Sequence, residues 1–461
     1  MNLNQKASSF QAKNIREYAS NSDSLAFFNL LTSPELFDKV DSLSPSHRER
    51  LFPPTETLSM FLAQAMSSDR SCQKVVNASS IKRLLSNLPL CSTHTGAYCK
   101  ARKRLPLTMI KELARYTGNK ITSQAPAAWH WRGRPVRLVD GATASMPDTK
   151  ENQLIYPQPG GQKPGLGFPI CRMVAMICLG SGAVLDAAIA PCKGKGSDEQ
   201  TILRSILDTL KPNDILMGDA LYATYFLLCA LKEKQVDGVF EQHGARKLKT
   251  DFSLGQRLGE KDHLITLNSP KKPDWMSQDV YEQSPDSLLV RELRTKGKTL
   301  VTTLLNHKQV SKKTLSLFYR ERWHIEVDLR HIKTTLGMDI LSCQTPEMVK
   351  KELWVYLLAY NLIRLLMAQA AFLSDVSVRQ LSFKHTLQLW LNWLQIGRDY
   401  YNEKHLTMLF LLIAQQKVGN RPGRIEPRVV KRRPKPFKLM MIPRQQAREE
   451  VRKNGHPKKL K

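Results

Sequence analysis

One short stretch of the chain combines a carboxylate with cations and an aromatic hydroxyl at helical spacing. At about 100° per residue, five positions between 319 and 333 fall within roughly 80° of one another on a helix. They are Tyr319, Arg322, Glu326, Arg330 and Lys333. A carboxylate can bind a divalent cation, and neighbouring cations can bind phosphate oxygens. The spacing therefore favours metal-assisted chemistry on a phosphate-containing substrate.

A solvated surface helix is the alternative explanation for this stripe. A pair such as Arg322 and Glu326, four residues apart, stabilises a helix by only a few tenths of a kcal/mol. The adjacent positions include Phe318 and Ile325, which predict an apolar, buried face. We therefore expect the stripe at the edge of a buried face, with Trp323 beside it.

Two aspartates stand at the ends of predicted strands elsewhere in the chain. Asp140 follows the apolar run 136–139, and Asp219 follows the short buried run 215–217. The elements predicted around them are a hairpin, a helix opened by a capping box, and a second helix (173–179 with 183–190, 197–200, 225–232). The resulting β-β-β-α-β-α order is that of a ribonuclease-H-like fold, in which a sheet brings two such carboxylates together.

Three converging carboxylates suit phosphodiester cleavage. Two divalent ions about 3.5–4 Å apart can stabilise both the attacking and the leaving oxygen, and hard oxygen ligands favour Mg²⁺. We predict Asp140, Asp219 and Glu326 as catalytic residues and as ligands of two Mg²⁺ ions, with Mn²⁺ as a substitute. Taken singly, each has another explanation: a turn at Asp140 and Gly141, a helix cap at Asp219, and a surface position at Glu326.

The motifs around these residues resemble the insertion sequence four family of bacterial DDE transposases. The order Tyr-x2-Arg-x3-Glu-x6-Lys in 319–333 is similar to the family signature, and 139–143 and 217–219 resemble its two aspartate motifs. Flanking segments are similar as well (97–106, 163–169, 359–364, 428–434). Two positions depart from the pattern without touching a carboxylate: Ala142 stands where many relatives have Thr, and Ala220 where Arg is common.

The resemblance implies cut-and-paste transposition through a hairpin on the transposon end, with a terminal base flipped out. It implies that Tyr319, Arg322 and Lys333 hold the hairpin and its phosphates, and that Arg330 adds a phosphate contact. Trp275 is the candidate ring on which the flipped base stacks, an interaction worth about 1–3 kcal/mol per base. A small local core around Trp275 is the alternative.

The composition favours a polyanionic partner. Seventy Lys and Arg against 41 Asp and Glu give a formal charge of +29, which predicts salt-sensitive association with nucleic acid. We expect double-stranded DNA as partner, both transposon ends and target, and the family implies a homodimer in the synaptic complex. Eight cysteines without zinc-type spacing, no apolar signal core, and an apolar run 353–373 broken by polar residues predict a cytoplasmic, nucleoid-associated protein without membrane contact.

The chain divides into six predicted regions, ordered as an α/β protein with a ribonuclease-H-like core interrupted by an antiparallel β insertion. The tail holds 15 Lys and Arg against 3 Asp and Glu and is expected to be extended until it meets a partner. The regions are an N-terminal helical DNA-binding domain (1–125), the first part of the core (130–243), the β insertion (244–312), the second part with the signature helix (313–375), a C-terminal helical region (376–417) and a basic, Pro-rich tail (418–461).

Two other classes of DNA-acting protein share some of these sequence features. A catalytically silent, transposase-derived DNA-binding regulator would keep the fold and charge, but retention of all three carboxylates argues against it. A tyrosine recombinase would need His47, Arg50 and a late tyrosine such as Tyr400, and the first two lie far from the third in the chain. The basic segment 95–104 fits a recognition helix or an ordinary surface helix equally well.

Overall fold

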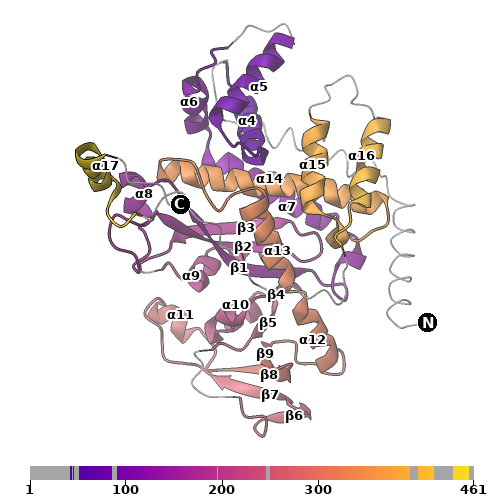
Figure 1. The fold of residues 1–461 in the computed structure, drawn as a ribbon. Coiled ribbons are helices and arrows are strands. Elements are labelled where there is room, and N and C mark those ends of the chain that lie inside the picture. The colour runs from indigo at the N-terminus through magenta and orange to yellow at the C-terminus, as the bar shows by residue number, and fades with distance from the viewer. Residues whose placement is uncertain are drawn as a thin grey trace.

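The computed structural model describes residues 42–43, 45, 51–85, 91–194, 196–244, 250–394, 403–419 and 440–455. The fold is α/β, with helices packed around a nine-stranded mixed sheet (Figure 1). The strand order is β3-β2-β1-β4-β5-β9-β8-β7-β6. The strands are β1 Val136–Ser145, β2 Ile170–Cys178, β3 Val184–Pro191, β4 Ile215–Met217, β5 Asp237–Glu241, β6 Gln256–Gly259, β7 Asp262–Asn268, β8 Ser287–Thr295 and β9 Lys298–Thr302.

The first five strands follow the predicted element order. β1 pairs antiparallel with β2 and parallel with β4, which pairs parallel with β5. Along the chain, helix α9 (Glu199–Arg204) follows β3 and precedes β4, and helix α10 (Tyr225–Glu233) follows β4 and precedes β5. The predicted capping box is wrong in one respect, because Asp198 caps α9 by accepting from Thr201 N at 2.9 Å. An aspartate one residue later offers a stronger acceptor than Ser197.

The antiparallel strands between 244 and 312 extend this sheet. β9 pairs antiparallel with β5, and β8, β7 and β6 follow outward. Leu288, Val290 and Val301 join the same apolar cluster as Leu216 and Phe240 of the central strands. The expectation that this segment loops out of the core is therefore corrected. The exposed edge of β5 needs backbone partners, and β9 supplies them.

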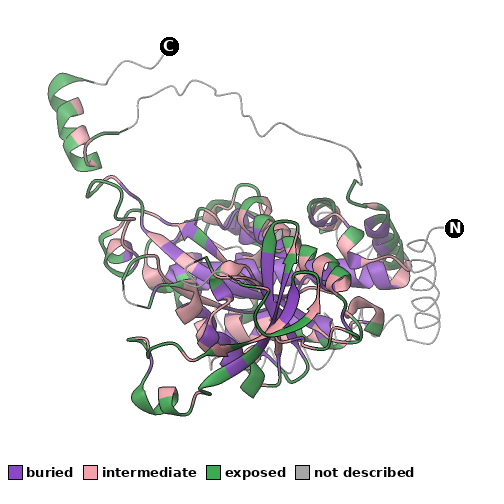
Figure 2. Cartoon of the chain, turned by 90° about the horizontal axis from the view of Figure 1, so that it is seen from below, coloured by how far each residue is buried: buried purple, intermediate pink, exposed green. Residues whose placement is uncertain are grey.

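Helices cover both faces of the sheet, and the buried residues lie at its centre (Figure 2). On one face pack α7 (Leu107–Ser123), α13 (Trp323–Arg330) and α14 (Pro346–Leu373); on the other lie α9 and α10. Helix α14 is long and apolar enough to cross a membrane, but 94% of its most apolar window is buried inside the protein. Its hydrophobicity is accounted for by the core.

In the part of the N-terminal region that the structure describes, three helices precede α7: α4 (Pro54–Met66), α5 (Cys72–Leu85) and α6 (Gly96–Arg104). The cations of α6 do not all face solvent, and the exception is Arg102. Its guanidinium is buried over the Phe61 ring at 4.9 Å and donates to Gln64 at 3.3 Å. An arginine in this position holds α6 against α4, which leaves three exposed cations (Lys100, Lys103 and Arg104).

The C-terminal part contains α15 (Phe383–Trp393), α16 (Glu403–Gln415) and α17 (Arg444–Asn454). The expectation of an extended tail is wrong for α17, which is helical with no buried residue and stands away from the body of the protein (Figure 2). Residues 420–439 and 456–461 of the tail lie outside the described residues, as do His47, Arg50 and Tyr400. Short elements complete the description: η1 Ala127–Trp129, α8 Lys150–Ile155, η2 Leu207–Thr209, η3 Ala220–Tyr222, α11 Gln278–Glu282, α12 Lys312–Arg320, η4 His331–Thr335 and η5 Val378–Gln380.

Candidate active site

Strand β1 holds Asp140 in mid-strand, not in a turn. Its Oδ1 accepts a hydrogen bond from Gly141 N at 2.8 Å. Burial raises the pKa of Asp140 to about 6; the Gly141 hydrogen bond and Arg322 oppose this shift, while the negative charges of Asp219 and Glu199 add to it. A carboxyl with a raised pKa among other carboxylates marks a position where positive charge would be stabilising.

Asp219 lies level with Asp140, two residues beyond the end of the neighbouring parallel strand β4. Leu138 of β1 pairs with Met217 of β4, so each aspartate stands two residues beyond the same pair. Asp219 Oδ1 accepts from Leu221 N at 2.8 Å and caps η3. The cap fixes the direction of the carboxylate, and a carboxylate has further lone pairs for a cation.

The signature stretch is broken and does not form one continuous α-helix. A two-residue turn separates α12 from α13, and α13 continues into a π-helical turn at His331–Thr335. At the break, Arg322 N donates to Tyr319 O at 3.2 Å, an i,i+3 bond. Such tighter spacing changes the angle per residue, so the predicted single stripe is divided between the helices.

Tyr319, on α12, is turned toward the second aspartate motif. Its hydroxyl donates to Gly218 O at 3.0 Å, next to Asp219. The ring is mostly buried and packs on the main apolar cluster. The side chain therefore ties α12 to the turn that carries Asp219.

Arg322 joins the third carboxylate to the first. Its Nη2 lies 2.6 Å from Glu326 Oε1, and its Nη1 lies 3.9 Å from Asp140 Oδ2. All three side chains are partly buried, with 20%, 36% and 20% of the side-chain surface exposed for Arg322, Glu326 and Asp140. One guanidinium thus supplies positive charge between two predicted metal ligands.

A buried ion cluster fixes the orientation of α13. Asp328 is fully buried and pairs with Arg364 of α14 and with Arg379, whose Nη1 lies 2.8 Å from Asp328 Oδ1. Burial would raise the pKa of Asp328, but the two arginines outweigh it and hold the pKa below its usual range. Because Asp328 points into the protein, Glu326 two residues earlier points toward the sheet end.

The other residues of the signature stretch lie away from the carboxylates. Trp323 (55% exposed) and Arg330 face solvent, and Lys333 is half-buried. His324 Nε2 lies 3.0 Å from Glu321 Oε2, whereas His331 stacks on Phe383 with ring centroids 4.8 Å apart. The two histidines therefore do not form a metal pair.

Trp275 sits on the face of the sheet opposite α13. Its ring is 44% exposed, packs edge-on against Phe226 of α10, and is covered by the guanidinium carbon of Arg204 at 3.7 Å. Arg204 ends α9, whose first residue is Glu199. Since a helix rises 1.5 Å per residue, Glu199 and Arg204 are about 7.5 Å apart along the axis of α9. Trp275 is thus both a member of a small aromatic cluster and partly accessible.

The donor set fits a divalent cation in chemistry. Aspartate and glutamate oxygens are the ligands that Mg²⁺ prefers. Asp140 lies within β1, and Asp219 lies just beyond the end of the neighbouring strand β4. Among the described residues, no three His, Cys, Asp or Glu side chains already surround a metal-sized position. Glu326 is instead paired with Arg322, a cation of the protein.

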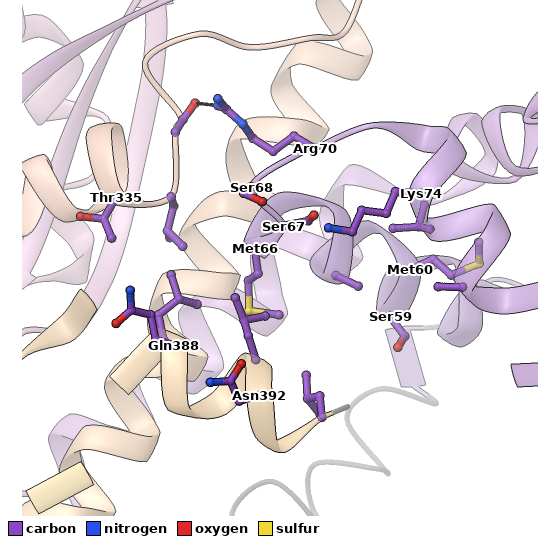
Figure 3. A pocket seen from close by; sticks show the side chains of 18 of the residues that line it. Ser59, Met60, Met66, Ser67, Ser68, Arg70, Lys74, Thr335, Gln388 and Asn392 are labelled. Atoms are coloured by element: carbon purple, nitrogen blue, oxygen red, sulfur yellow. Dashed lines mark hydrogen bonds between the residues drawn. The ribbon is translucent and has the colours of Figure 1, made fainter. Parts of the chain in front are cut away.

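A groove opens just beyond the signature stretch (Figure 3). It has a volume of about 1040 Å³ and lies between α4, α5, α15 and the residues that follow Lys333. Arg70 donates to Gly337 O at 2.5 Å across one end. Its charged lining residues are three cations and one acid, together with serine, threonine and amide side chains (Arg70, Lys74, Lys384, Glu56, Ser67, Thr335, Gln388).

Comparison with known proteins decides the family. The family model described as "Transposase DDE domain" matches residues 131–362, just over half of the chain. The chain is 26% identical to the transposase InsG for insertion sequence element IS4 of Escherichia coli (strain K12), over 87% of this chain and 90% of that protein. The chain is a DDE transposase of the IS4 family. Members of this family cleave DNA and transfer strands, so the transposase is a metal-dependent enzyme that acts on DNA.

Two further similarities were found. The transposase is 23% identical to a probable transposase for insertion sequence element IS5377 of Geobacillus stearothermophilus, over 79% of this chain and 90% of that protein. A solved structure of the piggyBac transposase synaptic complex with hairpin DNA aligns with a TM-score of 0.43 and 9% identity, over 88% of this chain and 87% of that chain.

The sequence did not point to Glu199 as a neighbour of the site. Glu199 directly follows the capping residue of α9, and a glutamate in the first turn of a helix is common for helix stability alone. Only the packing of α9 against β1 brings its carboxylate to Gly141.

Proposed function

We propose that this transposase binds the terminal inverted repeats of a bacterial insertion sequence and moves the element by cut-and-paste strand cleavage and strand transfer. The observation that supports this most directly is the arrangement of Asp140, Asp219 and Glu326. Asp140 in β1 and Asp219 just beyond β4 each lie two residues past the paired residues Leu138 and Met217, and Arg322 links Glu326 to Asp140. The strand order β3-β2-β1-β4-β5 supports a ribonuclease-H-like core.

Asp140, Asp219 and Glu326 would hold two Mg²⁺ ions, with Mn²⁺ as a substitute. When bound, such ions activate the attacking water or hydroxyl and stabilise the leaving oxygen. Arg322 contacts Glu326 through Oε1, so its positive charge would compete with a metal ion for this carboxylate. A DNA phosphate is a suitable new partner for that guanidinium, because arginine binds phosphate through two parallel hydrogen bonds.

The DNA would run along the exposed side of the signature stretch. Arg330 and Lys333 would contact DNA phosphates, and Trp323 would offer an exposed ring. Tyr319 would support the DNA backbone on the side of Gly218. The groove beyond Lys333 continues this path with a positive balance of charge. For the hairpin step, Trp275 would receive the flipped base once Arg204 moves off its face.

The remaining regions would serve DNA capture and pairing. The N-terminal helices (1–125) and the basic tail (418–461) would bind DNA on either side of the core (130–243 and 313–375), and the strands of 244–312 would carry Trp275. The C-terminal helical region (376–417) would complete the groove. Two transposases would pair two ends as a homodimer in the synaptic complex, in the cytoplasm at the nucleoid. A silent DNA-binding regulator is disfavoured because the three carboxylates are all present.

A labelled transposon-end duplex, made from the repeats that flank the gene, tests the proposal. Purified transposase should nick it only with Mg²⁺ or Mn²⁺, leave a free 3′ hydroxyl, and then produce hairpin and double-cut products. A covalent protein–DNA adduct would indicate a tyrosine recombinase. Retention of the duplex without cleavage at any metal concentration would indicate a regulator.

A further inference from the structure

We propose that Glu199 is a positioning residue of this transposase, which holds the segments carrying Asp140 and Asp219 at a fixed separation. This inference rests on the proposed cleavage function. It starts from a close approach: a Cβ built on Gly141 would lie 2.3 Å from Glu199 Cδ. Only glycine leaves room for this carboxylate directly behind Asp140.

The same carboxylate is bonded to the second aspartate segment. Glu199 Oε2 accepts from the hydroxyl of Tyr222 at 3.1 Å. Tyr222 is completely buried and lies three residues after Asp219, in the η3 turn that Asp219 caps. Glu199 therefore contacts β1 through Gly141 and the η3 turn through Tyr222.

Neighbouring contacts hold α9 in this place. Gln200 Nε2 donates to Leu221 O at 2.7 Å, and Thr224 Oγ1 donates to Gln200 Oε1 at 3.3 Å. On the other side, Arg172 Nε lies 3.8 Å from Glu199 Oε1, and its Nη1 donates to Ser197 O at 2.8 Å. The first turn of α9 is thus fastened to β2 and to the η3 turn, and Glu199 is the side chain that reaches both Gly141 and Tyr222.

The electrostatics agree with this geometry. Burial raises the pKa of Tyr222 well above its usual range, and the nearby Glu199 carboxylate adds to the shift. Tyr222 therefore stays a neutral hydrogen-bond donor, and Glu199 keeps its acceptor role. A displacement of about 1 Å at a reacting centre can lower a rate about 100-fold, so a brace of this kind bears directly on catalysis.

Four single variants and one double variant test the proposal by single-turnover cleavage and end-binding affinity. Glu199→Ala removes the brace and should lower the cleavage rate about 100-fold with little change in DNA affinity. Glu199→Gln keeps an acceptor for Tyr222 and should restore most of that rate. Tyr222→Phe should lower the rate, and added to Glu199→Ala it should have no further effect, because both remove one interaction. Asp208→Asn, at a carboxylate 98% exposed, is the matched control and should cleave normally.

A second readout does not depend on turnover. Calorimetry of Mn²⁺ binding to the transposase without DNA should show affinity roughly 10-fold lower in Glu199→Ala and recovered in Glu199→Gln. Wild-type cleavage by Glu199→Ala overturns the inference, as does a Gln variant as impaired as the Ala variant. A rate loss matched by lost DNA binding or lost thermal stability overturns it too. If the wild type does not cleave at all, the proposed function fails, and the Mn²⁺ comparison still judges Glu199.

Discussion

Arg322 Nη2 lies 2.6 Å from Glu326 Oε1, and this short ion pair occupies the carboxylate that should complete the catalytic triad. The same guanidinium reaches to 3.9 Å from Asp140. A cation of the protein therefore neutralises the site in the absence of DNA. This relationship connects metal binding to DNA binding, because a phosphate can compete for Arg322.

The carboxylates should be essential for cleavage and dispensable for end binding. We expect Asp140→Ala, Asp219→Ala and Glu326→Ala each to abolish strand cleavage, because affinity comes mainly from cations on phosphates. Cleavage gels and filter binding of the same end measure the two properties. Substantial Mg²⁺-dependent nicking by one folded variant would remove that residue from the triad.

Replacing Arg322 should separate metal binding from cleavage. Arg322→Ala frees Glu326, so affinity for Mn²⁺ without DNA should rise, while cleavage should fall through loss of a phosphate contact. Arg330→Ala removes an exposed arginine of the same stretch and serves as the control, with unchanged Mn²⁺ affinity. Calorimetry without DNA provides the measurement, and equal affinities of Arg322→Ala and wild type would contradict the competition.

His331 should make the fold sensitive to acid. Burial lowers the pKa of His331 to about 4, helped by the positive charge of Arg364. The unfolded chain takes up a proton near pH 6.5 whereas the folded state does not, so stability is full above pH 6.5 and falls as the pH drops toward 4. Between pH 7 and pH 5 this one group should cost about 2 kcal/mol.

The comparison with His331→Phe isolates that contribution. Phenylalanine preserves the stacking on Phe383 and cannot titrate. Urea unfolding at both pH values should show a smaller loss of stability in the variant, with the difference near the expected value. Identical pH dependence of stability in both proteins would show that folding does not lower the pKa of His331.

Trp275 should matter at the hairpin step. Trp275→Ala should spare the first nick and slow hairpin formation or resolution, because only the hairpin requires an unstacked terminus. Arg204→Ala uncovers the Trp275 ring and should leave that step intact or faster. A time course on a labelled end resolves the products. If Trp275→Ala loses the first nick in proportion to its stability, Trp275 is a core residue.

The tail should contribute to DNA affinity through charge. Removing residues 418–461 takes away a net charge of +12, whereas removing 444–461 takes away +5. Each phosphate contact that is lost should make the plot of log affinity against log salt shallower by about 0.9. The larger truncation should therefore flatten the plot more. Equal slopes for both truncations and the full chain would show that the tail does not touch DNA.

The sequence by itself predicted the local helices and strands and the three candidate carboxylates Asp140, Asp219 and Glu326. Alternating and continuous apolar runs predicted β1 to β4 because a strand buried against a core must be apolar over its own length. Asp219 could be placed after a strand end for the same reason, whereas the prediction of a strand end at Asp140 is wrong because β1 continues to Ser145 in its pairing with β2. The Tyr319 to Lys333 spacing indicated the family, since side chains on a helix are ordered by their separation along the chain.

Only the tertiary structure decided which distant side chains meet. Arg102 is basic in sequence yet buried, because α4 packs over it. The strands after 244 join the main sheet since β5 has a free edge. Glu199 reaches Gly141, and Arg322 reaches Asp140, through the packing of α9 and α13 on opposite faces of the sheet. Contacts between distant segments depend on packing geometry, which local sequence patterns do not encode.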